Sequence, residues 1–106
     1  MAKFLFQGSY SEQGLKGIIK DGGTARRQVV RALIESLGGT LEMFYFAHGK
    51  DDILVVADVP DAINAIATSL IINASGAVKV RTTVLITPEE IDQATRVTVN
   101  YRPPGQ

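Results

Sequence analysis

A chain of 106 residues has the length of one domain, and 45% hydrophobic with 21% charged residues is an ordinary globular composition. The 11 Lys and Arg residues balance the 11 Asp and Glu residues, so the sequence lacks the basic surplus expected of a nucleic-acid-binding protein. The absence of cysteine excludes disulfides, thiolate nucleophiles and cysteine-ligated metal centres. No signal-like N-terminal run and no stretch of roughly 20 apolar residues is present. We therefore expect a cytoplasmic protein without a nucleic-acid or membrane partner.

The first third of the chain predicts a strand followed by two helical segments. Residues 3–10 are rich in aromatic side chains, which is typical of a strand. Residues 11–23 predict a short helix that breaks at Gly22–Gly23, and Thr24 is then expected to cap a longer helix. The apolar stripe of that longer helix comprises Val30, Leu33, Ile34 and Leu37.

Two strands, a helix and a further strand follow. Residues 40–47 and 52–59 predict strands joined by a tight turn. Pro60 is expected to begin a helix at its first position, where the missing N–H costs nothing. Residues 77–86 predict the fourth strand. The expected apolar stripe of the helix between them comprises Ile63, Ile66, Ala67, Leu70 and Ala74.

The C-terminal part carries the clearest local signal in the sequence. Thr87 and Glu90 form the pattern of a capping box, with Pro88 at the first helical position. A short helix is expected there. Residues 97–106 are predicted to be an extended tail, because Pro103–Pro104 cannot continue a helix.

The order of elements predicts an α+β fold of the ferredoxin-like type. In that fold, β-α-β-β-α-β units form a four-stranded antiparallel sheet with both main helices on one face. Residues 1–106 are expected to form this single domain together with its C-terminal tail.

Both faces of the predicted sheet are apolar. In the second strand, Phe44 and Phe46 alternate with Leu41, Met43 and Tyr45, and the first and third strands show the same property. Helices on one side cover only one of these faces. We therefore expect the second face to pack on another copy of the chain, as a homodimer or a higher oligomer.

Seven segments, which span nearly the whole chain in order, carry a resemblance to a known family. They are GSY (8–10), KDGGTARR (20–27), ESLGGTLEMFYFAHG (35–49), VPDAINA (59–65), NASGAV (73–78), TTVLITPEE (82–90) and YRPPGQ (101–106). With this set of segments the chain resembles the GYD domain family of small bacterial proteins. The resemblance implies a dimeric α+β barrel in which two ferredoxin-like sheets pack face to face, and it implies no particular activity. Cofactor-free monooxygenases, lactone isomerases and haem enzymes use related barrels, which is an analogy at the level of the fold alone.

One position departs from the family pattern. The family is named for a Gly-x-Tyr-Asp segment at the turn between the second and third strands, and here that segment is Gly49–Lys50–Asp51–Asp52. Asp51 therefore stands where the family has tyrosine. A role of that tyrosine's phenol in the family does not carry over to this chain.

His48 is the only histidine and the best candidate for a catalytic base. With Gly49–Lys50 as the turn, His48 and Asp51 lie opposite each other on the face of Phe44 and Phe46. A histidine oriented by a carboxylate suits a general base, and the simpler interpretation is a solvated charge pair at a hairpin tip. Two such groups do not make a metal site, so no metal is predicted.

Arg26 follows a glycine pair and lies in the first turn of a predicted helix, where positive charge is normally disfavoured. Either an anionic ligand or Asp21 would relieve that mismatch. The segment lacks the Gly-Lys-Ser/Thr of a phosphate-binding loop.

Polar side chains on otherwise apolar elements are the remaining candidates for ligand binding. Hydroxyl and amide groups between sheet and helices, or at the seam between two sheets, could orient a small apolar or aromatic ligand, or could be satisfied core and cap groups. Asp52 joins them because it matches the last aspartate of the family segment. With Arg26, the candidate ligand-binding residues are Ser9, Tyr10, Tyr45, Asp52, Asn73 and Thr82.

Three hypotheses for function follow from these patterns. The first is an oligomer that binds a small, partly apolar molecule. The second is a cofactor-independent oxygenase or isomerase that uses His48 as base. The third is a structural or partner-binding module. No motif for haem, flavin or nicotinamide is present, so no cofactor is predicted.

Overall fold

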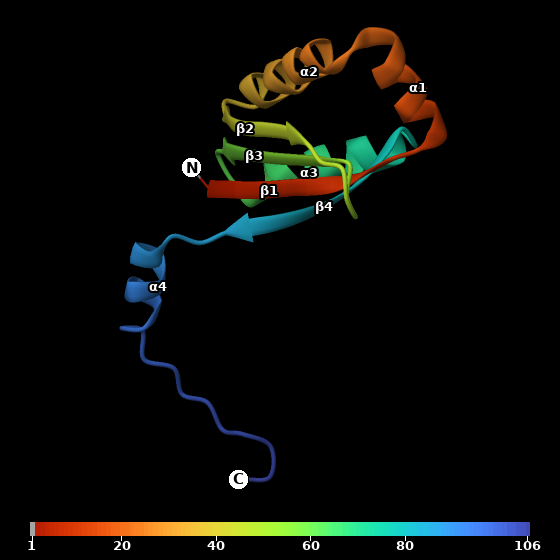
Figure 1. Cartoon of the computed structure of the whole chain (residues 1–106). Coiled ribbons are helices and arrows are strands. Elements are labelled where there is room, and N and C mark those ends of the chain that lie inside the picture. Colours follow the sequence, from red (N-terminus) through yellow and green to blue (C-terminus); the bar gives the residue numbers. More distant parts are fainter. Residues whose placement is uncertain (1) are drawn as a thin grey trace.

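The computed structural model describes residues 2–106 (Figure 1). Its elements are β1 (Ala2–Tyr10), α1 (Glu12–Asp21), α2 (Gly23–Ser36), β2 (Thr40–Phe46), β3 (Ile53–Val59), α3 (Ala62–Ala74), β4 (Val78–Leu85) and α4 (Pro88–Ala94). The strands form one antiparallel sheet with the order β2-β3-β1-β4. This topology is that of a ferredoxin-like α+β fold, as predicted.

The hydrophobic core lies between the sheet and helices α2 and α3. Phe6 of β1 lies opposite Val55 of β3 and Thr82 of β4, so alternate residues of three strands share the helix-covered face. Each large apolar side chain buried in this way contributes about 1.5–3 kcal/mol to stability. The buried core comprises Phe4, Phe6, Ile34, Ile53, Val55, Ala57, Val59, Ala65 and Val78.

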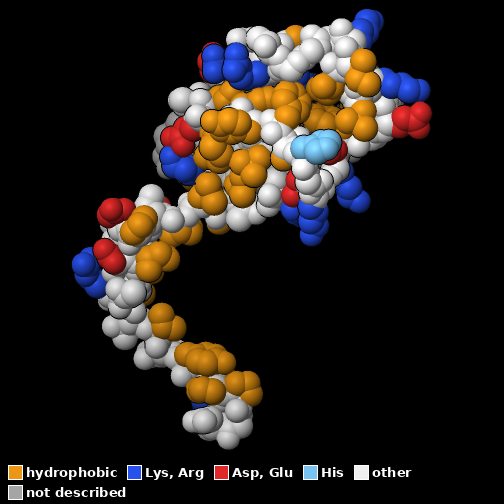
Figure 2. All heavy atoms as spheres, viewed as in Figure 1, with side chains coloured by type: hydrophobic (Ala, Val, Ile, Leu, Met, Phe, Trp, Pro, Cys, Tyr) orange, Lys and Arg blue, Asp and Glu red, His pale blue; other side chains and the backbone are white. Residues whose placement is uncertain are grey.

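The opposite face of the sheet, hereafter the open face, is not covered by a helix. Leu5, Leu54 and Val56 lie there and are only half-buried. Figure 2 shows hydrophobic side chains gathered over the middle of the sheet. The prediction of two apolar sheet faces is therefore confirmed in its main point.

The prediction was wrong for Leu41. A register shift between Leu41 and Met43 in the pairing of β2 with β3 is a bulge, which reverses the alternation at that point. Leu41 consequently packs against the core together with Phe44. Met43, which lies opposite Val56, remains on the open face.

The break between α1 and α2 lies at Gly22, within the predicted Gly22–Gly23 pair. Ser11 caps α1 by accepting a hydrogen bond from the Gly14 N–H at 3.1 Å. Gly22 has a φ of 85°, which glycine adopts without strain, and α2 begins directly afterwards at Gly23. Thr24 is therefore inside the helix and is not its cap.

Helix α3 buries a different stripe from the one predicted. Asp61, not Pro60, precedes the helix, and its side chain accepts a hydrogen bond from the Asn64 N–H at 2.9 Å. The side chains packed on the sheet belong to Ala65, Thr68 and Ile72. The predicted stripe faces outward instead: Ile63 is 73% exposed, and Ile66 and Leu70 are exposed as well.

The C-terminal arm, residues 86–106, extends away from the sheet and its helices (Figure 1). The capping box of α4 is confirmed, because Thr87 and Glu90 exchange side-chain to backbone hydrogen bonds. The radius of gyration is 17.0 Å, whereas a compact chain of this length has about 13 Å. The exposed apolar residues of the arm are Ile86, Ile91, Val97, Val99 and Tyr101.

Within residues 2–106, no helix combines the length and the apolar character that crossing a bilayer requires.

Candidate functional site

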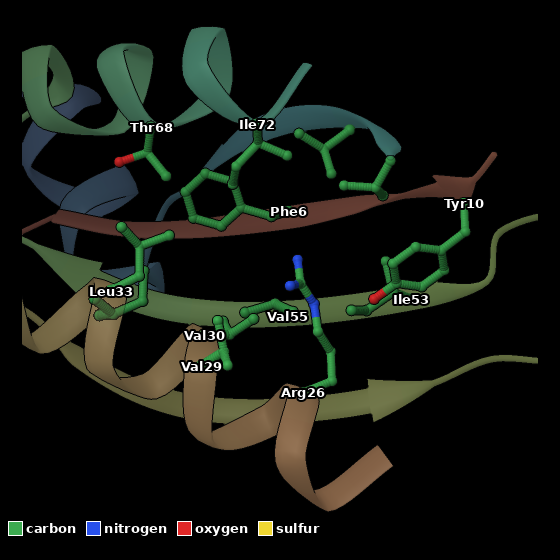
Figure 3. A pocket seen from close by; sticks show the side chains of 13 residues that line it. Phe6, Tyr10, Arg26, Val29, Val30, Leu33, Ile53, Val55, Thr68 and Ile72 are labelled. Carbon is green, nitrogen blue, oxygen red and sulfur yellow. The ribbon is translucent and has the colours of Figure 1, made fainter. Parts of the chain in front are cut away.

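A cavity of about 70 Å³ lies between the sheet and helices α2 and α3 (Figure 3). Most of its wall is apolar, and every strand except β2 contributes to it. Arg26 and Tyr10 supply the polar groups with unpaired buried atoms. The lining residues are Phe6, Tyr10, Arg26, Val29, Val30, Leu33, Ile34, Ile53, Val55, Thr68, Ile72, Val78 and Val80.

Local structure directs Arg26 into this cavity. The break at Gly22 starts α2 over the sheet, and a Cβ on Gly23 would lie only 2.9 Å from Cε2 of Phe46. The start of the helix therefore packs directly on that aromatic ring. Arg26 lies one turn further, on the side of α2 that faces the sheet, and its guanidinium points into the cavity (Figure 3).

Tyr10 reaches the same space from the end of β1. Its backbone N–H donates to Oδ2 of Asp52 at 3.0 Å, which fixes the end of the strand. Its ring lies 6.5 Å from the ring of Phe46. In Figure 3 the phenol oxygen and the side chain of Arg26 point toward one another across the mouth of the cavity.

The polar atoms of this pair are buried without hydrogen-bond partners. Among residues 2–106, neither the Tyr10 hydroxyl nor Nε of Arg26 has a partner, and no ion pair engages the guanidinium. Burial raises the pKa of the Tyr10 phenol above 10.0. The Arg26 guanidinium opposes part of that rise because it approaches the phenol oxygen, although the two side chains do not meet the geometry of a regular hydrogen bond. The phenol is therefore neutral and able to donate a hydrogen bond at physiological pH.

A larger hollow of about 420 Å³ opens outside this pair, between α1 and α2. Tyr10, Arg26 and Val29 line both the hollow and the cavity, so they form the boundary between the two spaces. Gly14 and Gly17 of α1 line the hollow, and a Cβ on Gly17 would meet nothing within 4 Å. We call this outer space the α1–α2 hollow.

Asp21 lines the α1–α2 hollow but forms no ion pair with Arg26 within the described part of the chain. The alternative that Asp21 neutralises this arginine is thus not realised in the structure. The guanidinium at the cavity therefore has no counter-ion among residues 2–106.

The other predicted hydroxyl groups lie apart from this pair. Thr82 lies on the helix-covered face, where its hydroxyl is buried without a partner beside α3. Ser9 and Tyr45 lie on the open face, and Tyr45 is 63% exposed. The structure therefore does not bring the predicted hydroxyls together into one cluster.

Asn73 has a structural role at the free edge of β4. Its Oδ1 accepts a hydrogen bond from the Val80 N–H at 2.8 Å, and its Nδ2 donates to the Val80 carbonyl at 3.2 Å. The side chain thereby pairs with the edge strand as a neighbouring strand would.

The connection between β2 and β3 places its charged residues differently from the predicted hairpin. Asp51 forms an ion pair with Arg81 of β4 at 3.0 Å, and Asp52 accepts a hydrogen bond from the Tyr10 N–H. His48 is exposed, and among residues 2–106 no hydrogen bond or ion pair joins it to Asp51. It lines neither the cavity nor the α1–α2 hollow.

No group of three or more His, Asp or Glu side chains within residues 2–106 is arranged to hold a metal ion.

Sequence reasoning found Arg26 and Tyr10 separately but missed the cavity that joins them. A signal was available in α2. Arg26, Val30 and Leu33 recur at helical spacing, so the arginine begins the same stripe that the apolar residues continue. An arginine at the start of a core-facing stripe must point toward the helix-covered face of the sheet, unless its side chain bends out to solvent.

The fold and the cavity define a small ferredoxin-like α+β protein with a largely apolar cavity between sheet and helices. The model of the GYD domain matches residues 4–95, and the chain belongs to that family. No curated protein and no solved structure matches the chain.

Proposed function

We propose that this protein binds a small, partly apolar molecule in the cavity between its sheet and helices. The observation that carries the proposal is the cavity itself, an apolar space with a few polar atoms at one end. That combination is typical of ligand sites, where apolar walls supply affinity and polar groups fix orientation.

The volume limits the ligand. The cavity of about 70 Å³ is smaller than the roughly 150 Å³ space that accommodates a benzene ring. A molecule with only a few non-hydrogen atoms fits without movement of the walls. A longer one would extend past Tyr10 and Arg26 into the α1–α2 hollow.

A cavity-filling substitution tests this function. We expect short alcohols or amides to perturb the NMR signals of Phe6, Val55 and Ile72 in the unmodified protein. Val30→Phe, which fills the cavity, should abolish the perturbation. Ile19→Phe is the matched control, because Ile19 is 84% exposed on α1. No perturbation of cavity residues by any short apolar molecule would contradict the proposal.

We further propose that a second copy of the chain covers the open face. Its centre is apolar, with Leu5, Leu54 and Val56, while ion pairs flank it at both ends. Lys3 lies with Glu42 and Asp58 at one end, and Arg81 pairs with Asp51 at the other. An apolar centre with a charged rim is typical of protein interfaces, and two-fold dimers are the commonest closed assembly.

The C-terminal arm supports self-association independently. It presents alternating apolar residues, Val97, Val99 and Tyr101, with exposures of 64%, 74% and 72%. An arm that leaves the body while exposing such side chains gains stability only by packing against another surface. A partner copy offers one such surface in its open face.

A further inference from the structure

We infer that the ligand of the cavity is a small carboxylate with a short apolar chain, whose head group contacts Arg26 and Tyr10. This inference rests on the proposed binding function and specifies its chemical class. Its basis is the positive charge of Arg26 at the mouth of the cavity, in addition to the cavity's size and shape.

The guanidinium of Arg26 belongs to a half-buried residue, and its Nε is buried. Removing a charged group from water without a counter-ion is costly, so arginines in such positions are normally paired. Nε of Arg26 is buried without a hydrogen-bond partner, and no carboxylate within residues 2–106 forms an ion pair with this side chain. An anion bound at this point would supply the missing partner.

Arg26 and Tyr10 both offer hydrogen-bond donors to that anion. Arginine offers planar N–H groups that match a carboxylate, and charge-assisted hydrogen bonds of this kind are among the strongest in proteins. The Tyr10 hydroxyl is also buried and unpartnered. It can donate one further hydrogen bond to the same carboxylate.

The head group fits on the inner side of Arg26, toward the cavity. Asp21 lies on the lining of the α1–α2 hollow, where its charge disfavours an anion. The inner cavity is lined by apolar side chains apart from Tyr10, Arg26 and Thr68, and the Thr68 hydroxyl already donates to the Asn64 carbonyl at 2.8 Å. The apolar chain of the ligand therefore lies deeper in the cavity, against Phe6 and Val55.

The charge balance favours a carboxylate over a phosphate. One guanidinium and one neutral phenol match a single negative charge, whereas a phosphate group carries more charge at neutral pH and has oxygens on every side. Those additional oxygens would meet apolar walls without hydrogen-bond donors.

Propionate and propionamide are the matched probes, because they have the same shape and differ in charge. We expect propionate to bind the unmodified protein at least about tenfold more tightly than propionamide, as measured by NMR titration. Arg26→Met should remove this preference while propionamide binding remains. Arg27→Met is the control, because Arg27 is exposed on the same turn, and it should preserve the preference.

Tyr10→Phe provides a second variant that removes only one oxygen. It should weaken propionate binding several-fold and leave propionamide less affected, and this result remains informative if Arg26→Met does not fold. Equal binding of the two probes would overturn the carboxylate inference and leave the binding function intact. Binding of inorganic phosphate without propionate would also overturn it. Binding of neither probe nor of neutral alcohols would contradict the proposed function itself.

Discussion

The Tyr10 hydroxyl and Nε of Arg26 are buried at the mouth of one cavity, and neither has a hydrogen-bond partner within residues 2–106. They come from β1 and α2, and the break at Gly22 brings the start of α2 over the end of the strand. Two donors oriented into a largely apolar space define where a polar head group can bind.

The first prediction concerns the titration of Tyr10. Its pKa is raised above 10.0 by burial, and the Arg26 guanidinium limits that rise. Arg26→Met should therefore raise the pKa of Tyr10 further. In a Tyr45→Phe/Tyr101→Phe background Tyr10 is the only tyrosine, and its ultraviolet titration can be followed directly. A fall of the pKa on Arg26→Met would contradict the arrangement at the cavity mouth.

The same shift has a consequence for stability. The folded state keeps the Tyr10 proton to higher pH than the unfolded state, so the unfolded state loses its proton first. The free energy of unfolding should therefore fall as pH rises above 10.0. Tyr10→Phe should reduce this dependence, and chemical denaturation across that range measures it.

The second prediction compares two glycines of α1. A Cβ on Gly14 would lie 2.1 Å from the carbonyl oxygen of Ala77, whereas nothing lies within 4 Å of a Cβ on Gly17. Gly14→Ala should destabilise the protein by about 1–3 kcal/mol through overpacking. Gly17→Ala should stabilise it by about 0.5–1 kcal/mol, because alanine favours a helix interior. Urea denaturation measures both, and equal effects would contradict the packing of α1 on the turn before β4.

The third prediction concerns the open face. Val56→Asp places a charge at the centre of the proposed interface and should yield a monomer of 11.4 kDa, while the unmodified protein sediments at about twice that mass. Ile19→Asp is the control, since its side chain is already exposed on α1. A monomeric unmodified protein at high concentration would exclude the proposed dimer.

The fourth prediction concerns the C-terminal arm. Substitution of Val97, Val99 and Tyr101 by serine should weaken the dimer, because the partner would no longer bury their apolar surface. The stability of the separated monomer should hardly change, since these side chains are exposed. Analytical ultracentrifugation and thermal unfolding distinguish the two effects. A loss of monomer stability with unchanged association would show that the arm packs on its own chain.

The fifth prediction concerns the cap of α4. Hydrogen bonds from Thr87 lower the pKa of Glu90 below 4.5. Its stabilisation of the helix is thus fully present above pH 4.5 and is lost as pH falls through the lowered value. Thr87→Ala removes the side-chain hydrogen bond but keeps the backbone N–H of residue 87, which donates to Glu90 Oε1 at 3.0 Å. The Glu90 carboxyl pKa should therefore rise only part of the way toward its ordinary value in an NMR titration. A complete return to the ordinary value would mean that the backbone N–H of residue 87 does not hold this carboxylate.

The elements that local chemistry determines could be predicted from the sequence. The capping box at Thr87 involves residues three apart, and the apolar runs of the strands alternate over short distances. The order of strands and helices follows from such local signals. The ferredoxin-like topology then follows from the order.

The features that were missed depend on distant parts of the chain. Helix α3 is apolar on nearly every side, so its pattern could not indicate that Ala65 and Thr68, rather than Ile63, face the sheet. Asp51 pairs with Arg81 instead of His48, because β4 brings that arginine across the sheet. Neither outcome is visible within a short window of sequence.

The most direct test of the carboxylate site is the position of bound propionate. We predict NMR contacts from its methyl group to Phe6 and Val55, with the carboxylate next to the Arg26 guanidinium. Contacts confined to exposed apolar residues of α3, such as Ile63 and Leu70, would contradict the site between sheet and helices.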